Sequence, residues 1–452
     1  MNQAPNDFNR REFLKGGSLA TLMTMLGGVE LIAQTNKVAE ELSSTAKVRV
    51  AVIGLGTWGR EILKTLAREP QAEVAAICDT YAASVRKCSV DAPGAKQVAD
   101  YQTILADKTI PAVVIATPSH LHREVTIEAL KAGKHVYCEA PLAHTIEEAK
   151  AIAIAANAAP KQVFQVGLQM RSDPQRHFLL PFVHSGALGT SVLARAQWHK
   201  AQSWRSASPN PDREKALNWR LHRETSPGLI GEIGIHQLDQ AGWFLNQRPT
   251  AVTGFNSLIK WKDGRDVPDT VQAMMEFPGG VRLQYDATLA NSFDADYEVY
   301  YGTYAAVMLR ENKAWMFKEV DSPLLGWEVY CRKDKFFRET GLSLKAGGSK
   351  QSDLTAPVDA PVPFEATPLY NSLAAFLYNV FEQETAIREF TDAFGDDPAA
   401  LLEHLKTEVE PKRKPGATAL EGFQATVIAL KTNEAVLSGQ RLEFKDEWYQ
   451  LS

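Results

Sequence analysis

A glycine-rich segment that begins at residue 54 has the spacing of a dinucleotide-binding loop. In such a loop the first glycine permits a tight turn, the second lets the backbone approach a pyrophosphate, and the third lets a helix pack closely. The N-terminus of that helix attracts the phosphate charge. The residues expected to bind the dinucleotide are therefore Gly54, Leu55, Gly56, Thr57, Trp58 and Gly59.

A carboxylate stands at the position where such a loop expects a ribose ligand. Asp79 lies 25 residues beyond Gly54, near the usual ~20. A carboxylate there accepts hydrogen bonds from ribose hydroxyls and repels a 2′-phosphate. NAD is therefore the expected cofactor and NADP is less favoured. The alternative for Asp79 is an N-cap for the segment that begins at Thr80.

The segments around these residues alternate between strand and helix patterns. A β-branched run over 48–53 precedes the glycines, and residues 60–68 follow with helical spacing. A strand before and a helix after are the context that supports such a motif. Further strands are predicted at 73–78, 111–116 and 135–138, and a helix at 124–132. This alternation predicts a doubly wound parallel sheet.

Later residues follow a different pattern. Strands are predicted at 192–199, 251–258, 270–277, 281–289, 297–301 and 314–318, and the stretch from 368 to 440 is helical. Closely spaced strands of this kind indicate a predominantly antiparallel sheet. The boundary between the two patterns falls near Gly167.

Composition excludes several classes of protein. The 452 residues are 45% hydrophobic and 23% charged, with a net charge of -5, so a disordered chain and a polytopic membrane protein are excluded. The absence of basic excess argues against a nucleic-acid partner. Four scattered cysteines without a CxxC pair indicate neither a disulfide framework nor a zinc site, and no metal is expected.

The N-terminus has the layout of an export leader. Arg10 and Arg11 precede Phe13 and Lys15, and a mainly apolar run covers 19–33. The run is short for a transmembrane span, and the paired arginines resemble a twin-arginine export signal. We expect a signal segment at 1–35, a linker at 36–46, and export by the twin-arginine machinery to the periplasm or cell envelope. No clear cleavage site is present, so retention as an anchor stays open.

Four later motifs carry a family resemblance. They are residues 116–122, 132–142, 166–174 and 231–239, read in order as ATPSHLH, AGKHVYCEAPL, VGLQMRSDP and GEIGIHQLD. With the glycine loop, the chain resembles the Gfo/Idh/MocA oxidoreductase family. The resemblance implies an α/β fold: an NAD-binding Rossmann domain at 47–167, then an α+β domain at 168–452 with a large, open, predominantly antiparallel sheet and a helical C-terminal segment.

The resemblance also assigns residues to the cofactor. Thr117 and Pro118 are expected to line the dinucleotide, and His120 and His122 to lie near the nicotinamide. Glu139, at the end of a predicted strand, is expected close to the nicotinamide ribose. Relatives commonly pair through the open sheet, so a homodimer or homotetramer is expected.

Hydride removal from a sugar carbon requires a general base for the neighbouring hydroxyl proton. The family uses an Asp-x-x-x-His pair and a Glu-Lys-Pro lysine. Here the pair is Glu232 and His236, whose i, i+4 spacing places both on one face of a helix. We expect His236 to be the acid/base and Glu232 its partner, with helix capping as the alternative for Glu232. The lysine is absent, because Ala140 occupies its position.

Three explanations for the missing lysine stay open. His236 acts alone; His199, Lys200 or Tyr137 substitutes for it; or the reaction has changed. Gln169 and Arg171 match positions that face the substrate in relatives, so they are expected to bind substrate hydroxyls or carboxylates. An interdomain ion pair is the alternative for Arg171.

Compartment and chemistry together predict a closed cycle. Outside the inner membrane there is no free pool of nicotinamide cofactor, so the cofactor is expected to stay bound and to be regenerated. The first reading is an exported NAD-dependent oxidoreductase that acts on a sugar or sugar derivative. The second is a redox-neutral glycoside hydrolase that proceeds by oxidation, elimination, hydration and reduction. The third is a non-catalytic sugar- or NAD-binding protein.

Overall fold

The protein is represented by a computed structural model that describes residues 47–208, 210–310, 313–325, 328, 333–336, 339–344 and 366–451. The predicted signal segment at 1–35 and the linker at 36–46 lie outside the described residues. So does part of the predicted second domain, at 345–365.

The first sheet has six parallel strands in the order β3-β2-β1-β4-β5-β6. Its central strand β1 is buried at five of its six positions, which explains its unbroken run of apolar residues. The sheet confirms the predicted Rossmann fold and adds two strands of three residues that the sequence pattern did not reveal, β3 and β6. The strands are β1 Val48–Ile53, β2 Ala72–Cys78, β3 Lys96–Val98, β4 Ala112–Ile115, β5 His135–Cys138 and β6 Phe164–Val166.

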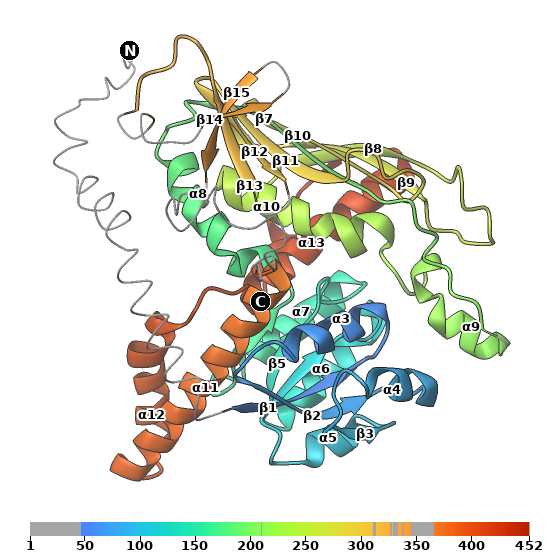
Figure 1. The fold of residues 1–452 in the computed structure, drawn as a ribbon, viewed down its shortest axis with the longest axis vertical. Coiled ribbons are helices and arrows are strands. Elements are labelled where there is room, and N and C mark those ends of the chain that lie inside the picture. Colours follow the sequence, from blue (N-terminus) through green and yellow to red (C-terminus); the bar gives the residue numbers. More distant parts are fainter. Residues whose placement is uncertain are drawn as a thin grey trace, which may run out of the picture. The chain divides into compact units, whose positions relative to one another are not determined.

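Helices connect these strands and cover the sheet (Figure 1). Helix α7 begins at a side-chain cap, in which Thr145 Oγ1 accepts a hydrogen bond from the Glu148 backbone N–H. Helix α3 begins without one, a difference that matters for the site below. The helices are α3 Thr57–Leu66, α4 Ala82–Cys88, α5 Gln102–Ala106, α6 His122–Lys131 and α7 Ile146–Asn157.

A helix from near the end of the chain completes the core of this first domain. In α11, Pro368–Phe394, the side chains of Leu373, Phe376 and Leu377 pack in one buried cluster with Val50 and Val52 of β1. The helix therefore belongs to the Rossmann core by its packing, although it follows the second domain in sequence.

The second sheet has ten strands in the order β14-β15-β13-β12-β11-β7-β10-β9-β8-β16. Only the neighbours β7 and β10 are parallel, and every other described pair is antiparallel. The predicted antiparallel character is confirmed. The strands are β7 Ser191–His199, β8 Ala251–Ser257, β9 Thr270–Glu276, β10 Arg282–Thr288, β11 Asp296–Gly302, β12 Ala305–Arg310, β13 Lys313–Lys318, β14 Lys333–Phe336, β15 Glu339–Leu344 and β16 Leu442–Glu443.

One face of this sheet is covered and the other is open. Burial alternates along β9 and β10, as expected for a sheet with one packed face. Helices lie against the packed face (Figure 1), whereas Phe255 on the other face is 71% exposed. The helices of this part are α8 Pro174–His184, α9 Pro211–Leu217, α10 Ile235–Leu245 and α13 Ala419–Ser438, whereas α12 Pro398–His404 packs against α11.

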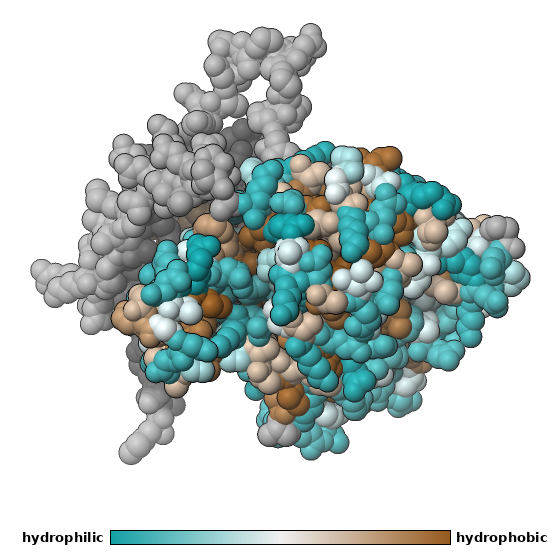
Figure 2. Space-filling model, turned by 90° about the horizontal axis from the view of Figure 1, so that it is seen from below, coloured by the Kyte–Doolittle hydropathy of each residue, from teal (hydrophilic) through white to brown (hydrophobic). Residues whose placement is uncertain are grey.

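The surface seen from below mixes hydrophilic and hydrophobic residues in small groups, without one continuous apolar patch on that face (Figure 2). Within the described ranges, no helix combines the length and the apolar character that a membrane crossing requires.

Candidate active site

The glycine loop joins β1 to α3 through two close backbone contacts. Gly54 has a φ of +97°, and a Cβ there would lie 2.5 Å from the Ala116 carbonyl oxygen. A Cβ on Gly59 would lie 1.9 Å from the Gly54 carbonyl oxygen. Both positions therefore require glycine, the first for its backbone conformation and the second for close packing of the helix on the loop.

Gly56 is different, because a Cβ there would meet no protein atom within 4 Å. It precedes the first turn of α3, where Thr57 and Trp58 lie and where no side chain caps the helix. Open space in front of uncapped backbone N–H groups suits a phosphate. This part of the loop thus fits the pyrophosphate of a dinucleotide.

Asp79, at the end of β2, closes the far side of the loop. Its Oδ2 accepts a hydrogen bond of 2.9 Å from the Leu55 backbone N–H, and its Oδ1 accepts one of 2.8 Å from Tyr81 N–H. Helix α4 begins at Ala82 with Tyr81 as its N-cap residue, so Asp79 is not the cap of that helix. A half-buried carboxylate has further lone pairs for ribose hydroxyls.

Two buried oxygen atoms without partners lie at the carboxyl ends of neighbouring strands. Thr117 Oγ1 follows β4 and Glu139 Oε1 follows β5, and neither has a hydrogen-bond partner among the described residues. Burial raises the pKa of Glu139 to about 7. Unpaired buried oxygens are rare unless a ligand satisfies them. With the glycine loop and Asp79, they form a set that fits NAD.

The two histidines after this edge differ in their contacts. His122 is buried, and its ring nitrogens lie 2.9 Å from the carbonyl oxygens of Thr117 and Pro141. It therefore lies between the loops that follow β4 and β5, and its neutral ring donates a hydrogen bond to one of the two carbonyl oxygens. His120 lies beyond Pro118 in a short 3₁₀ turn, and its Nδ1 is 3.2 Å from the Thr225 carbonyl oxygen. Burial lowers the pKa of both histidines, that of His122 to about 4.

Glu232 joins the second domain to the first. Its Oε1 accepts hydrogen bonds from the hydroxyls of Ser119, at 3.0 Å, and Ser226, at 3.1 Å, while Arg220 Nε lies 3.5 Å from its Oε2. The side chain is buried, and burial raises its pKa. Glu232 is thus held at the Rossmann edge beside the predicted nicotinamide site.

The predicted pairing of Glu232 with His236 is not observed. Glu232 lies in a π-helical turn, Ile230–Gly234, and His236 in the first turn of the α-helix that follows. The wider π turn changes the angle between residues four apart, so the one-face argument for a regular α-helix does not hold. None of the polar contacts that Glu232 makes within the described chain reaches His236.

His236 has the properties of an available base. Its ring makes no hydrogen bond with any described residue, and the side chain retains partial exposure. Burial lowers its pKa to about 4, so the imidazole is neutral at pH 7 and can accept a proton.

The two predicted substrate ligands lie in the short 3₁₀ helix Gln169–Ser172. Gln169 is half-buried, and its side chain makes no hydrogen bond with another described residue. Arg171 is paired instead with Asp239 by two bonds, of 2.8 and 2.9 Å, and with Glu421 at 2.5 Å. Both carboxylates belong to the second domain, so the pairing is within that domain and already engages the guanidinium.

None of the three predicted substitutes for the missing lysine makes a hydrogen bond or ion pair with Glu139 or Glu232 within the described residues. Tyr137 is fully buried, and its hydroxyl lies 3.1 Å from Ser372 Oγ in α11. His199, at the end of β7, lies 2.5 Å from an oxygen of Asp286. Lys200 is exposed.

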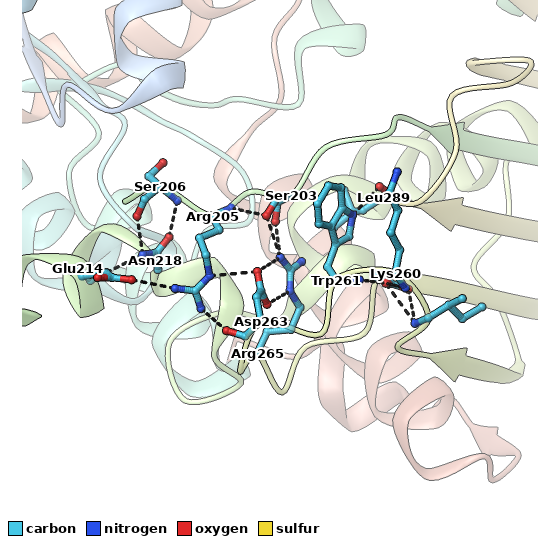
Figure 3. A network of polar contacts seen from close by, with 12 residues as sticks. Ser203, Arg205, Ser206, Glu214, Asn218, Lys260, Trp261, Asp263, Arg265 and Leu289 are labelled. Carbon is cyan, nitrogen blue, oxygen red and sulfur yellow. Dashed lines mark hydrogen bonds and ion pairs between the residues drawn. The ribbon is translucent and has the colours of Figure 1, made fainter. Parts of the chain in front are cut away.

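A polar network fixes the segment that carries Arg220, which is residues 200–226, hereafter the cross-segment. Figure 3 shows Arg205 between Glu214 and Asp263, while Arg265 binds Asp263 and the Ser203 carbonyl oxygen. Asn218 donates to the carbonyl oxygens of Ser206 and Glu214 and accepts from Ser206 N–H. The stretch before Arg220 is therefore held by many bonds.

Ser119, Arg220 and Ser226 were not identified from the sequence. Ser119 lies inside the motif at 116–122, so that motif could have predicted that Ser119 lies near the site. Arg220 and Ser226 lie in the cross-segment, which carries no recognisable motif. No group of three or more metal-binding side chains exists within the part of the chain that the structure describes.

Comparisons with known proteins agree with this geometry. Residues 48–168 match the oxidoreductase family with an NAD-binding Rossmann fold, and residues 181–306 match the GFO/IDH/MocA C-terminal domain. The two ranges together cover more than half of the chain.

Relatives include levoglucosan dehydrogenase of Pseudarthrobacter phenanthrenivorans, 32% identical over 42% of this chain but only 52% of that protein. The 1,5-anhydro-D-fructose reductase of Ensifer adhaerens is 29% identical over 56% of this chain and 73% of that protein. The solved structure of levoglucosan dehydrogenase with NADH and L-sorbose shares the fold, with a TM-score of 0.64 and 20% identity over 88% of this chain and 99% of that one. The chain therefore belongs to the Gfo/Idh/MocA oxidoreductase family, and its N-terminal domain is the NAD-binding Rossmann domain of that family.

Proposed function

We propose that the protein is an NAD-dependent oxidoreductase that acts on a sugar or sugar derivative and is exported with its cofactor bound. The observation that carries the proposal is one cluster of groups. Unpaired buried oxygens of Thr117 and Glu139 lie at the strand ends of the Rossmann sheet, and Glu232 of the second domain reaches Ser119 at the same edge.

The chain's own residues divide the work as follows. Gly56 and the first turn of α3 receive the pyrophosphate, Asp79 the adenosine ribose, and Glu139 the nicotinamide ribose. When bound, NAD supplies the hydride acceptor. His236 takes the proton from the sugar hydroxyl whose carbon loses the hydride, because its neutral imidazole has no protein partner within the described residues. The buried Glu232 holds a negative charge beside the reacting carbon.

The twin arginines at residues 10 and 11 support export, and they make cofactor retention part of the proposal. In a compartment without free NAD, oxidation of one sugar must be balanced by reduction of a second on the same enzyme. A hydride, which is one proton with two electrons, leaves a carbon of the first sugar, and a second proton leaves the hydroxyl on that carbon. The second sugar takes up the hydride and a proton.

Analysis of bound dinucleotide tests this proposal. Protein purified after native export is denatured, and the released dinucleotide is measured against protein concentration. We expect about one NAD per chain, because a retained cofactor must occupy every working molecule. Protein that emerges empty and binds added NAD only weakly would contradict the closed cycle.

Substrate assays then separate the sugar oxidoreductase from its alternatives. Levoglucosan and 1,5-anhydro-D-fructose are suitable first probes because related proteins are named for them. Hydride transfer from one labelled sugar to another supports the oxidoreductase. Release of an aglycone from a glycoside without build-up of NADH supports the redox-neutral hydrolase instead. Tight sugar binding with neither reaction supports a binding protein.

We also propose that the open face of the second sheet joins two copies of the chain. Phe255 is 71% exposed and Met274 37% exposed on neighbouring strands of that face. Phe255→Glu is expected to shift the mass measured by light scattering toward the monomer, because a buried charge without a partner opposes association. Phe293→Glu is the matched control, since Phe293 is 82% exposed but lies in a loop. Equal masses for wild type and F255E would exclude this face as the interface.

A further inference from the structure

Two buried carboxylates stand at the proposed nicotinamide end, and each requires a compensating charge or hydrogen bonds. Glu139 ends β5, and Glu232 lies in the π-helical turn before α10. Ionised carboxylates are costly in such surroundings unless they are paired. Ala140, next to Glu139, carries no charge.

Arg220 is a cation that acts on both carboxylates. Its Nε lies 3.5 Å from Glu232 Oε2. Its charge also lowers the pKa of Glu232 and of Glu139, against the rise that burial causes in each. The Arg220 side chain is 38% exposed, so part of the guanidinium is accessible to a ligand.

The other groups around the two carboxylates are uncharged at pH 7. At Glu232 they are the hydroxyls of Ser119 and Ser226. At Glu139 they are the Trp58 side chain and the Ala140 backbone N–H. The titratable neighbours of Glu139 on its own strand are Tyr137 and Cys138, and burial raises the pKa of both. Arg220 is therefore the positive charge among these groups; it contacts Glu232 directly, whereas at Glu139 its effect on the pKa is smaller than those of burial and of the hydrogen bonds from Trp58 and Ala140.

The position of Arg220 is fixed by its surroundings. Its guanidinium carbon lies 4.7 Å from the ring centre of Trp219 and 5.9 Å from that of Trp204. A cation over an aromatic face is attracted by the ring electrons. The network of Figure 3 holds the cross-segment up to Asn218, two residues before Arg220. A side chain supported in this way is preorganised rather than free to follow solvent.

We propose that Arg220 is a positioning residue of the active site, which holds Glu232 ionised and directed at Ser119 at the nicotinamide end. This role rests on the proposed function, because it matters for turnover only if Glu232 faces the reacting sugar. Arg220 of the cross-segment thereby supplies a positive charge, which Ala140, the residue after Glu139, does not carry.

Three variants test the role. Arg220→Gln removes the charge, Arg220→Lys retains it, and Arg223→Gln is the matched control, because Arg223 lies in the same segment but binds Asp266 through its backbone and side chain. Turnover is measured with the better of levoglucosan and 1,5-anhydro-D-fructose across pH, beside NAD affinity and an infrared titration of the carboxyl band.

For Arg220→Gln we expect kcat to fall about 10-fold with little change in KM or NAD affinity, since a misplaced group costs rate more than binding. The acid limb of the profile should move up by about 0.5 unit, a small shift because Arg220 is partly exposed. The infrared titration should shift in the same direction. Arg220→Lys should recover most of the rate, and R223Q should match wild type.

The outcomes distinguish failure of the role of Arg220 from failure of the proposed function. An unchanged pH profile and infrared titration in R220Q would overturn the role of Arg220, as would an equal shift in R223Q. If R220Q fails to fold, Arg220→Met, which removes the charge but keeps most of the side-chain length, is measured in its place: an upward shift of the acid limb at retained NAD affinity supports the role, and an unchanged profile opposes it. Wild-type protein that binds no NAD and turns over neither sugar would instead refute the proposed function, while the infrared titration still tests the charge.

Discussion

His236→Ala is expected to lower kcat by ~10²–10⁴, the usual cost of losing a general base. The wild-type imidazole is neutral at pH 7 because burial lowers its pKa to about 4. Loss of the proton acceptor should therefore cost the same factor at every pH from about 6 to 9, where the wild-type ring does not titrate. A histidine with the ordinary value of about 6.5 would instead give a cost that shrinks as pH falls through that value.

The measurement is kcat and kcat/KM against pH with one sugar substrate, beside NAD affinity at each pH. His184→Asn is the control, because His184 is exposed on α8 and its ring contacts the Phe244 carbonyl oxygen. H184N should retain wild-type turnover. If H236A retained full turnover with NAD bound, another group would be the base, and Glu139, with a pKa of about 7, would be the next residue to test.

Two glycine substitutions in one loop are expected to have different effects: one lowers NAD affinity and the other lowers stability. Gly56→Ala places a methyl group where the protein offers no contact within 4 Å, so the fold should keep its stability. The same methyl group occupies the approach of a pyrophosphate to the backbone, and NAD affinity should fall at least ~100-fold. Gly59→Ala places a methyl group 1.9 Å from the Gly54 carbonyl oxygen, and overpacking of this kind typically costs ~1–3 kcal/mol.

Thermal unfolding and NAD titration of the purified variants distinguish the two effects. G56A should unfold near the wild-type temperature while NAD no longer raises that temperature. G59A should unfold at a lower temperature even without NAD. Gly94→Ala is the control, since a Cβ at Gly94 also meets nothing within 4 Å and lies outside the loop. NAD binding by G56A that equals wild type would place the pyrophosphate elsewhere.

The sequence predicted the parts of this fold that depend on local patterns. The glycine loop and its strand and helix form as expected, because glycine spacing and β-branched runs act within a few residues. The strands β3 and β6 were missed, since three residues are too few to show a period. Strand β12, Ala305–Arg310, was also missed: the predicted strands end at 301 and resume at 314, and the residues between them were left unassigned.

The candidate site was predictable only where motif residues supply it. Thr117, Glu139 and Glu232 were named because each lies in a motif. The contact between Ser119 and Glu232 joins residues 113 positions apart, and no local pattern encodes that distance. The π-helical turn was equally hidden, because the spacing of Glu232 and His236 is the same on paper in either kind of helix. The position of Arg220 depends on the conformation of the cross-segment, and long-range hydrogen bonds and ion pairs determine that conformation.

The packing of α11 has a consequence for the order of events during synthesis. Phe376 and Val380 fill the core between the glycine-loop helix and β1, so about 330 residues must follow β1 out of the ribosome before that core closes. Domains usually fold in the order in which they are made, but this cofactor domain is completed by nearly the last helix. An early fragment that ends at the first domain would expose Val50 and Val52, and firm binding of NAD should await the finished chain. An export route that accepts only folded protein would then act as a checkpoint on complete synthesis.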